Sequence, residues 1–304
     1  MLSPRRILFE RILCPTDLTE NSDDALGYAI TLARLFGAKL LVCHSVESLS
    51  DNFEVEVLRA EEHLKQAVLD RRGTRTVNSF KWEKIVSRGV PTSVLLQEAT
   101  RHQVDLIVMR SGRHTNTTIL ESTSEYLCRT APCPILITHF KDRDWISPEH
   151  DEVILKRVLV AYDFSADSEL ALSYGFSLAQ EFQAELHVLH VLPHSPKSEV
   201  PEIAGLPTID EIAFQKVIAA LRSAVPSDAS PWCEIRQVVR IGYPYREILN
   251  YADEAQIDLI CMGSSGTGFG PKALFGSNSD RVLRQSPCSV LIARPSGSQV
   301  GASH

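Results

Sequence analysis

The chain has 304 residues, of which 44% are hydrophobic and 23% charged, a composition typical of globular domains with full apolar cores. Because this length is about twice that of a common domain, two domains are expected. The net charge of −7 argues against a protein that binds nucleic acid or an anionic membrane, since such proteins usually carry a basic face.

Apolar runs alternate with helical patterns from the first residues onward. We predict strands near residues 11–14, 39–45, 82–86, 105–109 and 134–139, and helices near 22–36, 55–72, 92–102 and 122–130. The strands are apolar throughout rather than alternating, as expected where helices cover both faces of a sheet. Strand–helix alternation of this kind predicts a doubly wound parallel sheet, an α/β fold.

The sequence then repeats itself in the same order. The matching segments are 11–17 with 157–163, 89–91 with 242–244, 105–107 with 258–260, and 132–137 with 287–292. We therefore predict two domains of one fold, residues 1–141 and 156–304, joined by a polar linker at about 142–155. In the second copy a proline-rich stretch, residues 193–207, delays the second helix and is interpreted as a loop.

A glycine-rich segment, residues 262–279 (MGSSGTGFGPKALFGSNS), follows an apolar run of the second copy and precedes a helical pattern. A strand, a glycine-rich loop and a helix start allow backbone N–H groups to surround an anion. The turn from Gly263 to Gly266 can bring the backbone close to a ribose or phosphate, because neither residue has a Cβ. Residues 276–279 are expected at a helix N-terminus, which favours phosphate, and Lys272 could reach a terminal phosphate.

Asp163 ends the first strand of the second copy. Ligands of doubly wound sheets bind beyond the carboxyl ends of the strands, so this carboxylate could accept hydrogen bonds from a ribose hydroxyl or a base amino group. The alternative is a structural role, because an Asp before Ser165 and Ser168 is also a good turn or cap residue. The glycine-rich segment itself matches neither the P-loop nor the Rossmann fingerprint.

Over nearly its whole length the sequence resembles the universal stress proteins, as a tandem of two such domains. The most specific element is the ATP-binding pattern of that family: Gly, two residues, Gly, nine residues, then Gly and Ser or Thr. Gly263, Gly266, Gly276 and Ser277 match this pattern without a gap. The resemblance implies two Rossmann-like sheets of the adenine-nucleotide alpha-hydrolase type.

The resemblance also implies a set of nucleotide-binding residues. It assigns Asp163 and Val191 to the adenosine, with Ala161 and Met262 lining that end, and it assigns the phosphates to the start of the last helix. The expected set is Ala161, Asp163, Val191, Met262, Gly263, Gly266, Gly276, Ser277, Asn278 and Ser279. The ligand is expected to be ATP with Mg²⁺, and no catalytic or metal-ligating side chain is predicted. Asn278 stands where the family often has Val.

The first copy has lost this pattern. Arg110 stands in the position of Gly263 and Glu121 in that of Gly276, whereas Asp17 is kept. A carboxylate at position 121 would repel phosphate. We therefore predict that the first domain does not bind ATP in the family manner. Its basic cluster comprises Arg110, Arg113 and His114; it is interpreted as a solvated loop, with an altered anion site as the alternative.

The remaining features favour a protein of the cytoplasm. No apolar run reaches the roughly 18 residues that span a bilayer, and residues 1–10 lack the apolar core of a signal peptide. The seven cysteines include no C-x-x-C pair and are interpreted as buried apolar side chains in a reducing compartment, with a redox role as the alternative.

The leading hypothesis is a stress-response protein that binds ATP, or a related adenine nucleotide, in its second domain and has a regulatory output. Slow ATP hydrolysis and a ligand-free interaction module are the alternatives. No nucleophile–base pair stands out near the loop, and His187 and His190 are interpreted as strand histidines.

The resemblance implies that the last strands, 134–139 and 289–294, pair the two domains within the chain. Two chains would then form a homodimer, and the sequence does not identify a regulatory protein partner.

Overall fold

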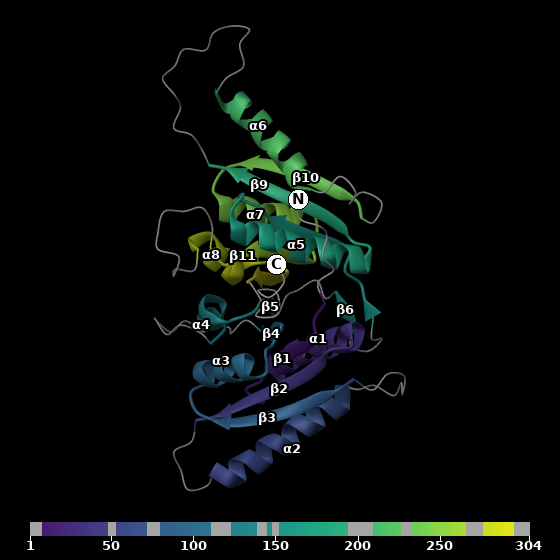
Figure 1. The fold of residues 1–304 in the computed structure, drawn as a ribbon, viewed down its shortest axis with the longest axis vertical. Coiled ribbons are helices and arrows are strands. Elements are labelled where there is room, and N and C mark those ends of the chain that lie inside the picture. Colours follow the sequence, from purple (N-terminus) through teal and green to yellow (C-terminus); the bar gives the residue numbers. More distant parts are fainter. Residues whose placement is uncertain are drawn as a thin grey trace, which may run out of the picture.

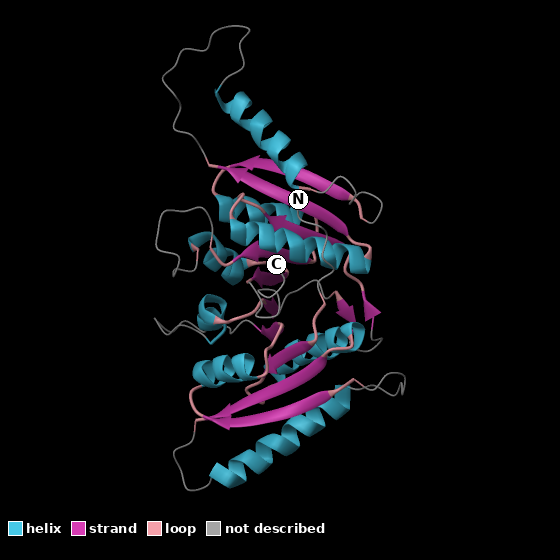
Figure 2. Cartoon of the chain, viewed as in Figure 1, coloured by secondary structure: helices cyan, strands magenta, loops and turns pink. Residues whose placement is uncertain are grey.

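The strands of both sequence copies join in one sheet, with helices on its two faces (Figures 1 and 2). The computed structural model describes residues 8–47, 53–71, 80–110, 123–138, 145–147, 152–193, 209–225, 233–265 and 276–294. The ten strands of this sheet follow the order β10-β9-β8-β11-β12-β5-β4-β1-β2-β3. Among the described residues, no helix is both long and apolar enough to cross a membrane.

Each half is a doubly wound α/β unit, as the alternation of strands and helices predicts. The first half comprises β1 (Arg11–Pro15), α1 (Glu20–Phe36), β2 (Lys39–Val46), α2 (Phe53–Arg71), β3 (Trp82–Arg88), α3 (Pro91–Arg101), β4 (Leu106–Arg110), α4 (Thr123–Thr130) and β5 (Ile135–Thr138). The second comprises β8 (Arg157–Ala161), α5 (Ala166–Phe182), β9 (Glu185–Leu192), α6 (Ile209–Ala224), β10 (Ile235–Ile241), α7 (Pro244–Glu254), β11 (Leu259–Gly263), α8 (Ser277–Gln285) and β12 (Ser289–Ala293). Within each half the strands are parallel.

The apolar strands contribute side chains to two separate cores, one on each face of the sheet. Successive residues of β1 show this, because Ile12 and Cys14 belong to one core and Leu13 to the other. The first core packs under α1, α2, α5 and α6, through Ala29, Leu64, Tyr174 and Leu221. The second packs under α3, α4, α7 and α8, through Leu95, Leu127, Ile248 and Val282. A strand with both faces covered needs apolar side chains at every position, which explains the runs in the sequence.

The two halves join through the last strand of each, as the family resemblance implies. β12 pairs with β5 in antiparallel register, with Val290 opposite Ile137, Leu291 opposite Leu136, and Ile292 opposite Ile135. Both sheets therefore continue into each other, and each half covers what would otherwise be an exposed edge of the other.

Two arginines of the second half strengthen this junction by contacting α4 of the first. Nη2 of Arg294 donates to the carbonyl oxygen of Cys128 at 2.7 Å, and its Nη1 donates to that of Ala131 at 3.4 Å. These carbonyls end α4, where a cation is favoured by the helix dipole. Nη1 of Arg284 lies 2.8 Å from Oε1 of the buried Glu125, which neutralises that carboxylate.

The segment between the halves contains an apolar anchor that the prediction of a polar linker did not include. Trp145 is only 2% exposed, and its ring packs edge-on against Tyr28 of α1, with 5.2 Å between the ring centroids. A short antiparallel pair, β6 (Ile146–Ser147) and β7 (Glu152–Val153), follows it. The described part of this segment is thus packed onto the first half.

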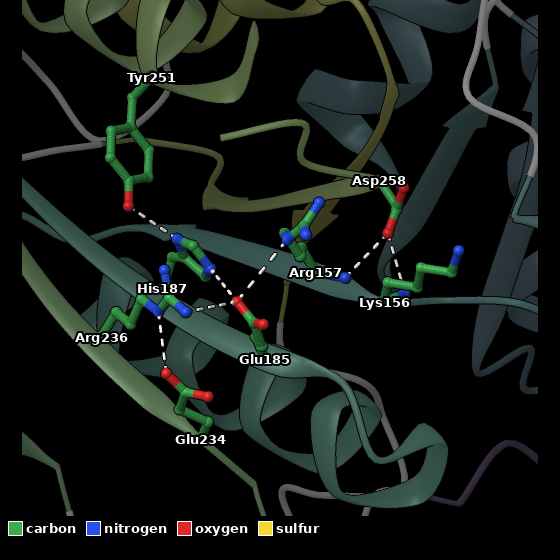
Figure 3. Close-up of polar contacts among 8 residues, drawn as sticks. All are labelled: Lys156, Arg157, Glu185, His187, Glu234, Arg236, Tyr251 and Asp258. Carbon is green, nitrogen blue, oxygen red and sulfur yellow. Dashed lines mark hydrogen bonds and ion pairs between the residues drawn. The ribbon is translucent and has the colours of Figure 1, made fainter. Parts of the chain in front are cut away.

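A carboxylate at the start of β4 and of β11 ties each central strand to its neighbour. Oδ2 of Asp105 accepts hydrogen bonds from the backbone N–H groups of Glu10 and Arg11, both at 2.9 Å. Asp258 makes the same two contacts, both at 2.8 Å, with residues 156–157 (Figure 3). This shared role explains why both copies have an Asp before the apolar run.

A third polar cluster surrounds a buried histidine at the amino ends of the strands (Figure 3). His187 of β9 is 1% exposed; its Nδ1 lies 2.7 Å from the Tyr251 hydroxyl, and its Nε2 lies 3.3 Å from Oε2 of Glu185. Arg236 also pairs with Glu185, at 3.4 Å. Burial lowers the pKa of His187, and Glu185 opposes this only in part. Leu41 occupies the equivalent position of the first copy.

We expect Asp105→Ala to lower the free energy of unfolding by about 2 kcal/mol, because two backbone N–H groups lose their acceptor. Asp105→Asn keeps one oxygen in place and should cost less. Urea denaturation of the full chain measures both changes. Equal midpoints for the wild type and the Ala variant would contradict this structural role.

Stability should also decline in acid through His187. Because burial lowers its pKa in the folded state, the unfolded state binds a proton first. The stabilisation is therefore complete above the unfolded pKa of about 6.5 and is lost as the pH falls through and below that value. His187→Gln, which cannot take up a proton, should lose less stability between pH 7.5 and 5.5, as measured by urea denaturation at each pH. A loss equal to that of the wild type would refute the assignment.

Candidate functional site

The strand order reverses between β8 and β11, and this switch point is where open α/β sheets bind ligands. Three of the residues expected at the adenosine end lie nearby: Ala161 ends β8, Val191 lies in β9 and Met262 lies in β11. All three pack into the same apolar core, on the face covered by α7 and α8. The fold therefore brings these side chains together on one face of the sheet.

Asp163 follows β8 and closes a tight turn before α5. Its Oδ1 accepts hydrogen bonds from the backbone N–H of Ser165 at 3.1 Å and from the Ser165 hydroxyl at 2.5 Å. Phe164 between them has a φ of 65°, a left-handed conformation that such a turn supports. Ser165 in turn caps α5 by accepting from the N–H of Ser168 at 3.2 Å. The structural alternative for Asp163 is thus realised.

Asp17 forms the same turn in the first half. Its Oδ1 accepts from the N–H and the hydroxyl of Thr19, at 3.0 and 2.6 Å, around Leu18 with a φ of 62°. Burial alone would raise the pKa of Asp17, but hydrogen bonds from Thr19 and Ser22 outweigh it and lower the pKa. The turn alone is reason enough for this Asp to persist in a copy without the glycine pattern.

Two aromatic residues that the sequence analysis did not single out, Tyr162 and Phe164, stand beside Asp163. The ring of Phe164 lies 4.9 Å from that of Tyr162 and 4.9 Å from that of His190, measured between centroids. Nδ1 of His190 lies 2.8 Å from the carbonyl oxygen of Tyr162, which holds the ends of β8 and β9 together. In the sequence, the aromatic residues on both sides of Asp163 were the signal from which this group could have been predicted.

Asp167, which the sequence analysis also missed, fixes the start of the glycine-rich segment. Its Oδ2 accepts from the Ser264 hydroxyl at 3.1 Å, from the Ser265 N–H at 3.1 Å and from the Ser265 hydroxyl at 2.6 Å. Gly263 allows this approach, since a Cβ there would lie 2.7 Å from the Cβ of Asp167. In the first half Arg110 takes the place of Gly263 and pairs with Asp24 of α1.

The N-terminus of α8 is the expected phosphate end. Gly276 is its N-cap residue, so no side chain caps the helix, and its N–H donates to the Ser264 carbonyl at 3.0 Å. A Cβ on Gly276 would meet nothing closer than 3.4 Å, so the packing of the described chain does not require glycine. Ser277 is exposed and Asn278 half-buried, whereas the buried Ser279 hydroxyl donates to the Gly263 carbonyl at 3.0 Å.

Several predicted residues lie outside the described residues. They are Gly266, Lys272, Arg113, His114 and Glu121. Within the described residues, no group of three or more His, Cys, Asp or Glu side chains is placed to hold a metal ion. All seven cysteines are buried and none forms a disulfide, and burial raises the pKa of Cys128, for example, to about 12, which disfavours a reactive thiolate.

Together the joined sheets and their switch points define a tandem pair of Rossmann-like α/β domains. The model of the universal stress protein family matches residues 8–139 and 155–294. The chain therefore belongs to the universal stress protein family.

Known relatives share this tandem architecture or part of its sequence. Universal stress protein Rv2623 of Mycobacterium tuberculosis is 33% identical over 235 residues, which cover 77% of this chain and 73% of the relative. Universal stress protein E of Salmonella typhi is 23% identical, with 95% of each chain covered. The crystal structure of a universal stress protein from Archaeoglobus fulgidus superimposes with a TM-score of 0.61 at 25% identity, covering 93% of this chain and 98% of that one.

The two described glycines of the segment should respond differently to a methyl group. Gly263→Ala pushes a Cβ into Asp167 and should lower the free energy of unfolding by about 2 kcal/mol. Gly276→Ala meets only ordinary contacts and should change it by less than about 0.5 kcal/mol. Urea denaturation of the two variants side by side tests this, and a larger loss for Gly276→Ala would overturn the assignment.

Proposed function

We propose that this protein is a stress-response regulator that binds an adenine nucleotide, ATP in particular, in its second half. The observation that carries the proposal is the uncapped start of α8. Gly276 offers no capping side chain, and a Cβ there would meet only ordinary van der Waals contacts in the described chain. Among the described residues, the first N–H groups of the helix have no acceptor, so they can bind a phosphate, which the helix dipole also favours.

The opposite end of the site suits a nucleoside. Ala161, Val191 and Met262 provide apolar surface from three adjacent strands, and Asp163 provides a carboxylate at the same edge of the sheet. A base needs apolar surface for its rings and a few polar groups for its edge, and a ribose needs a hydrogen-bond acceptor. The distribution of polar and apolar groups therefore supports a nucleotide better than a simple anion.

The first half lacks the features on which this proposal rests. Arg110 occupies the position of Gly263, is almost fully buried and is paired with Asp24. The second half has no side chain at this position. We therefore expect a single nucleotide per chain.

Mg²⁺ would reach the site with the phosphates of ATP. The nearby Asp167 carboxylate already accepts three hydrogen bonds, so the donor set of the described residues favours the phosphate anion over a bare cation.

The output that we propose is regulatory, with slow ATP hydrolysis at most. A cytoplasmic homodimer with a regulatory protein partner completes the proposal; sedimentation velocity of the purified chain tests the assembly.

The proposal is tested by denaturing protein purified under native conditions and identifying any released nucleotide by chromatography, followed by calorimetric titration with ATP. We expect ATP to bind once per chain. Gly276→Val should weaken binding by about tenfold or more while keeping a folded protein, because its side chain enters the phosphate cradle.

Arg110→Ala is the matched control in the first half, and it should leave ATP affinity unchanged. Absence of any released nucleotide together with no calorimetric binding would refute the proposal and favour a ligand-free interaction module. Rapid turnover of ATP would instead favour a dedicated enzyme.

A further inference from the structure

The second half carries a cluster of tyrosines and arginines that the first half lacks. It comprises Tyr243, Tyr245 and Arg246 at the start of α7, and Arg281 in α8. The equivalent positions of the first copy, counted from the matching segments, are Val90, Thr92, Ser93 and Tyr126. Like the glycine pattern, this cluster is confined to one copy.

Tyr245 holds the two guanidinium groups near each other. The guanidinium carbon of Arg281 lies 4.5 Å from the centroid of the Tyr245 ring, and that of Arg246 lies 5.7 Å from it. Nε of Arg246 also donates to the Tyr245 hydroxyl at 2.8 Å. That hydrogen bond lowers the pKa of Tyr245. Stacking on an aromatic ring restrains an arginine but leaves most of its N–H donors available.

Neither guanidinium is neutralised within the described part of the chain. No described carboxylate forms an ion pair with Arg246 or Arg281, and Asp280, the neighbour of Arg281, is paired with Arg284 at 3.1 Å. The chain as a whole carries a net charge of −7. Two adjacent cations without a carboxylate are thus an exception to the overall charge, and they suit an anionic ligand.

The cluster lies on the same face of the sheet as the proposed nucleotide site. Tyr245 packs against the same apolar core as Ala161, Val191 and Met262. The turn before it is held by the N–H of Gly242, which donates to the carbonyl at the end of β9 at 2.9 Å. Arg281 lies about one turn beyond Ser277, the first residue of α8, and α7 and α8 are packed together (Figure 1).

We propose that Arg246 and Arg281 bind the outer phosphates of the nucleotide and thereby favour a triphosphate over a monophosphate. This inference rests on the proposed function. The helix N-terminus offers backbone N–H groups to a single phosphate, whereas each further phosphate adds negative charge that needs cations. Two arginines positioned by one tyrosine supply that charge and the planar donors that match phosphate oxygens.

The test is calorimetric titration of the full chain with AMP, ADP and ATP, using the wild type, Arg246→Gln, Arg281→Gln and the double variant. We expect each single variant to bind ATP about tenfold more weakly and AMP within about twofold of the wild type, since the lost contacts serve the outer phosphates. Arg281→Lys keeps the charge and should recover part of the loss. Arg222→Gln, an exposed position in α6, is the matched control and should change nothing.

The possible outcomes distinguish a failure of the outer-phosphate role from a failure of the proposed function. If the wild type binds ATP but the glutamine variants weaken AMP and ATP equally, or weaken neither, the outer-phosphate role is wrong while the proposed function stands. If the wild type binds no adenine nucleotide, both are wrong. Thermal unfolding of every variant checks that folding is retained, and a selective loss of ATP affinity in a stable variant supports the inference.

Discussion

The antiparallel pairing of β12 with β5 is the contact on which the rest of the molecule depends. Through it two parallel sheets become one, so that only β3 and β10 remain as edges of the ten-stranded sheet. Two side-chain contacts reinforce this backbone pairing. Arg294 binds the carbonyl end of α4, and Arg284 neutralises Glu125. Each half therefore completes the surface of the other, and the duplicated chain behaves structurally as one unit.

A comparison of the two copies separates structural features from features that serve a ligand. Both copies keep the Asp turn after the first strand and the carboxylate at the start of the fourth. An ion pair between the second and third strands is also kept, with its signs exchanged: Lys39 with Glu83, and Glu185 with Arg236. These features stabilise the fold in either copy. Gly276 and the Tyr–Arg cluster occur once, which is expected of residues that serve a ligand.

Much of the fold could be predicted from the sequence, because its signals are local or repeated. Apolar runs and helical patterns placed the elements close to their observed bounds, and the repeat predicted two copies of one unit. The burial of Trp145 and the contacts of Asp167 could not be predicted in this way. Asp167 contacts Ser264 and Ser265, which are 97 and 98 residues further along the chain. The periodicity of apolar residues carries no information about such a distant contact. The site residues came from a spacing pattern, from the end of a strand and from a family resemblance, which identify positions but not what each residue touches.

The two described glycines of the site show why that distinction matters. Gly263 is required by the protein itself, since Asp167 lies where its Cβ would be, and Asp167 also holds the two serines that follow. Gly276 is required by nothing in the described chain, and the helix that it begins has no side-chain cap. One end of the segment is thus fixed by the protein's own contacts, while at the other end the first N–H groups of α8 have no acceptor among the described residues. A ligand that satisfies those N–H groups would bind next to a part of the site that the protein's own contacts already position, which lowers the entropic cost of binding.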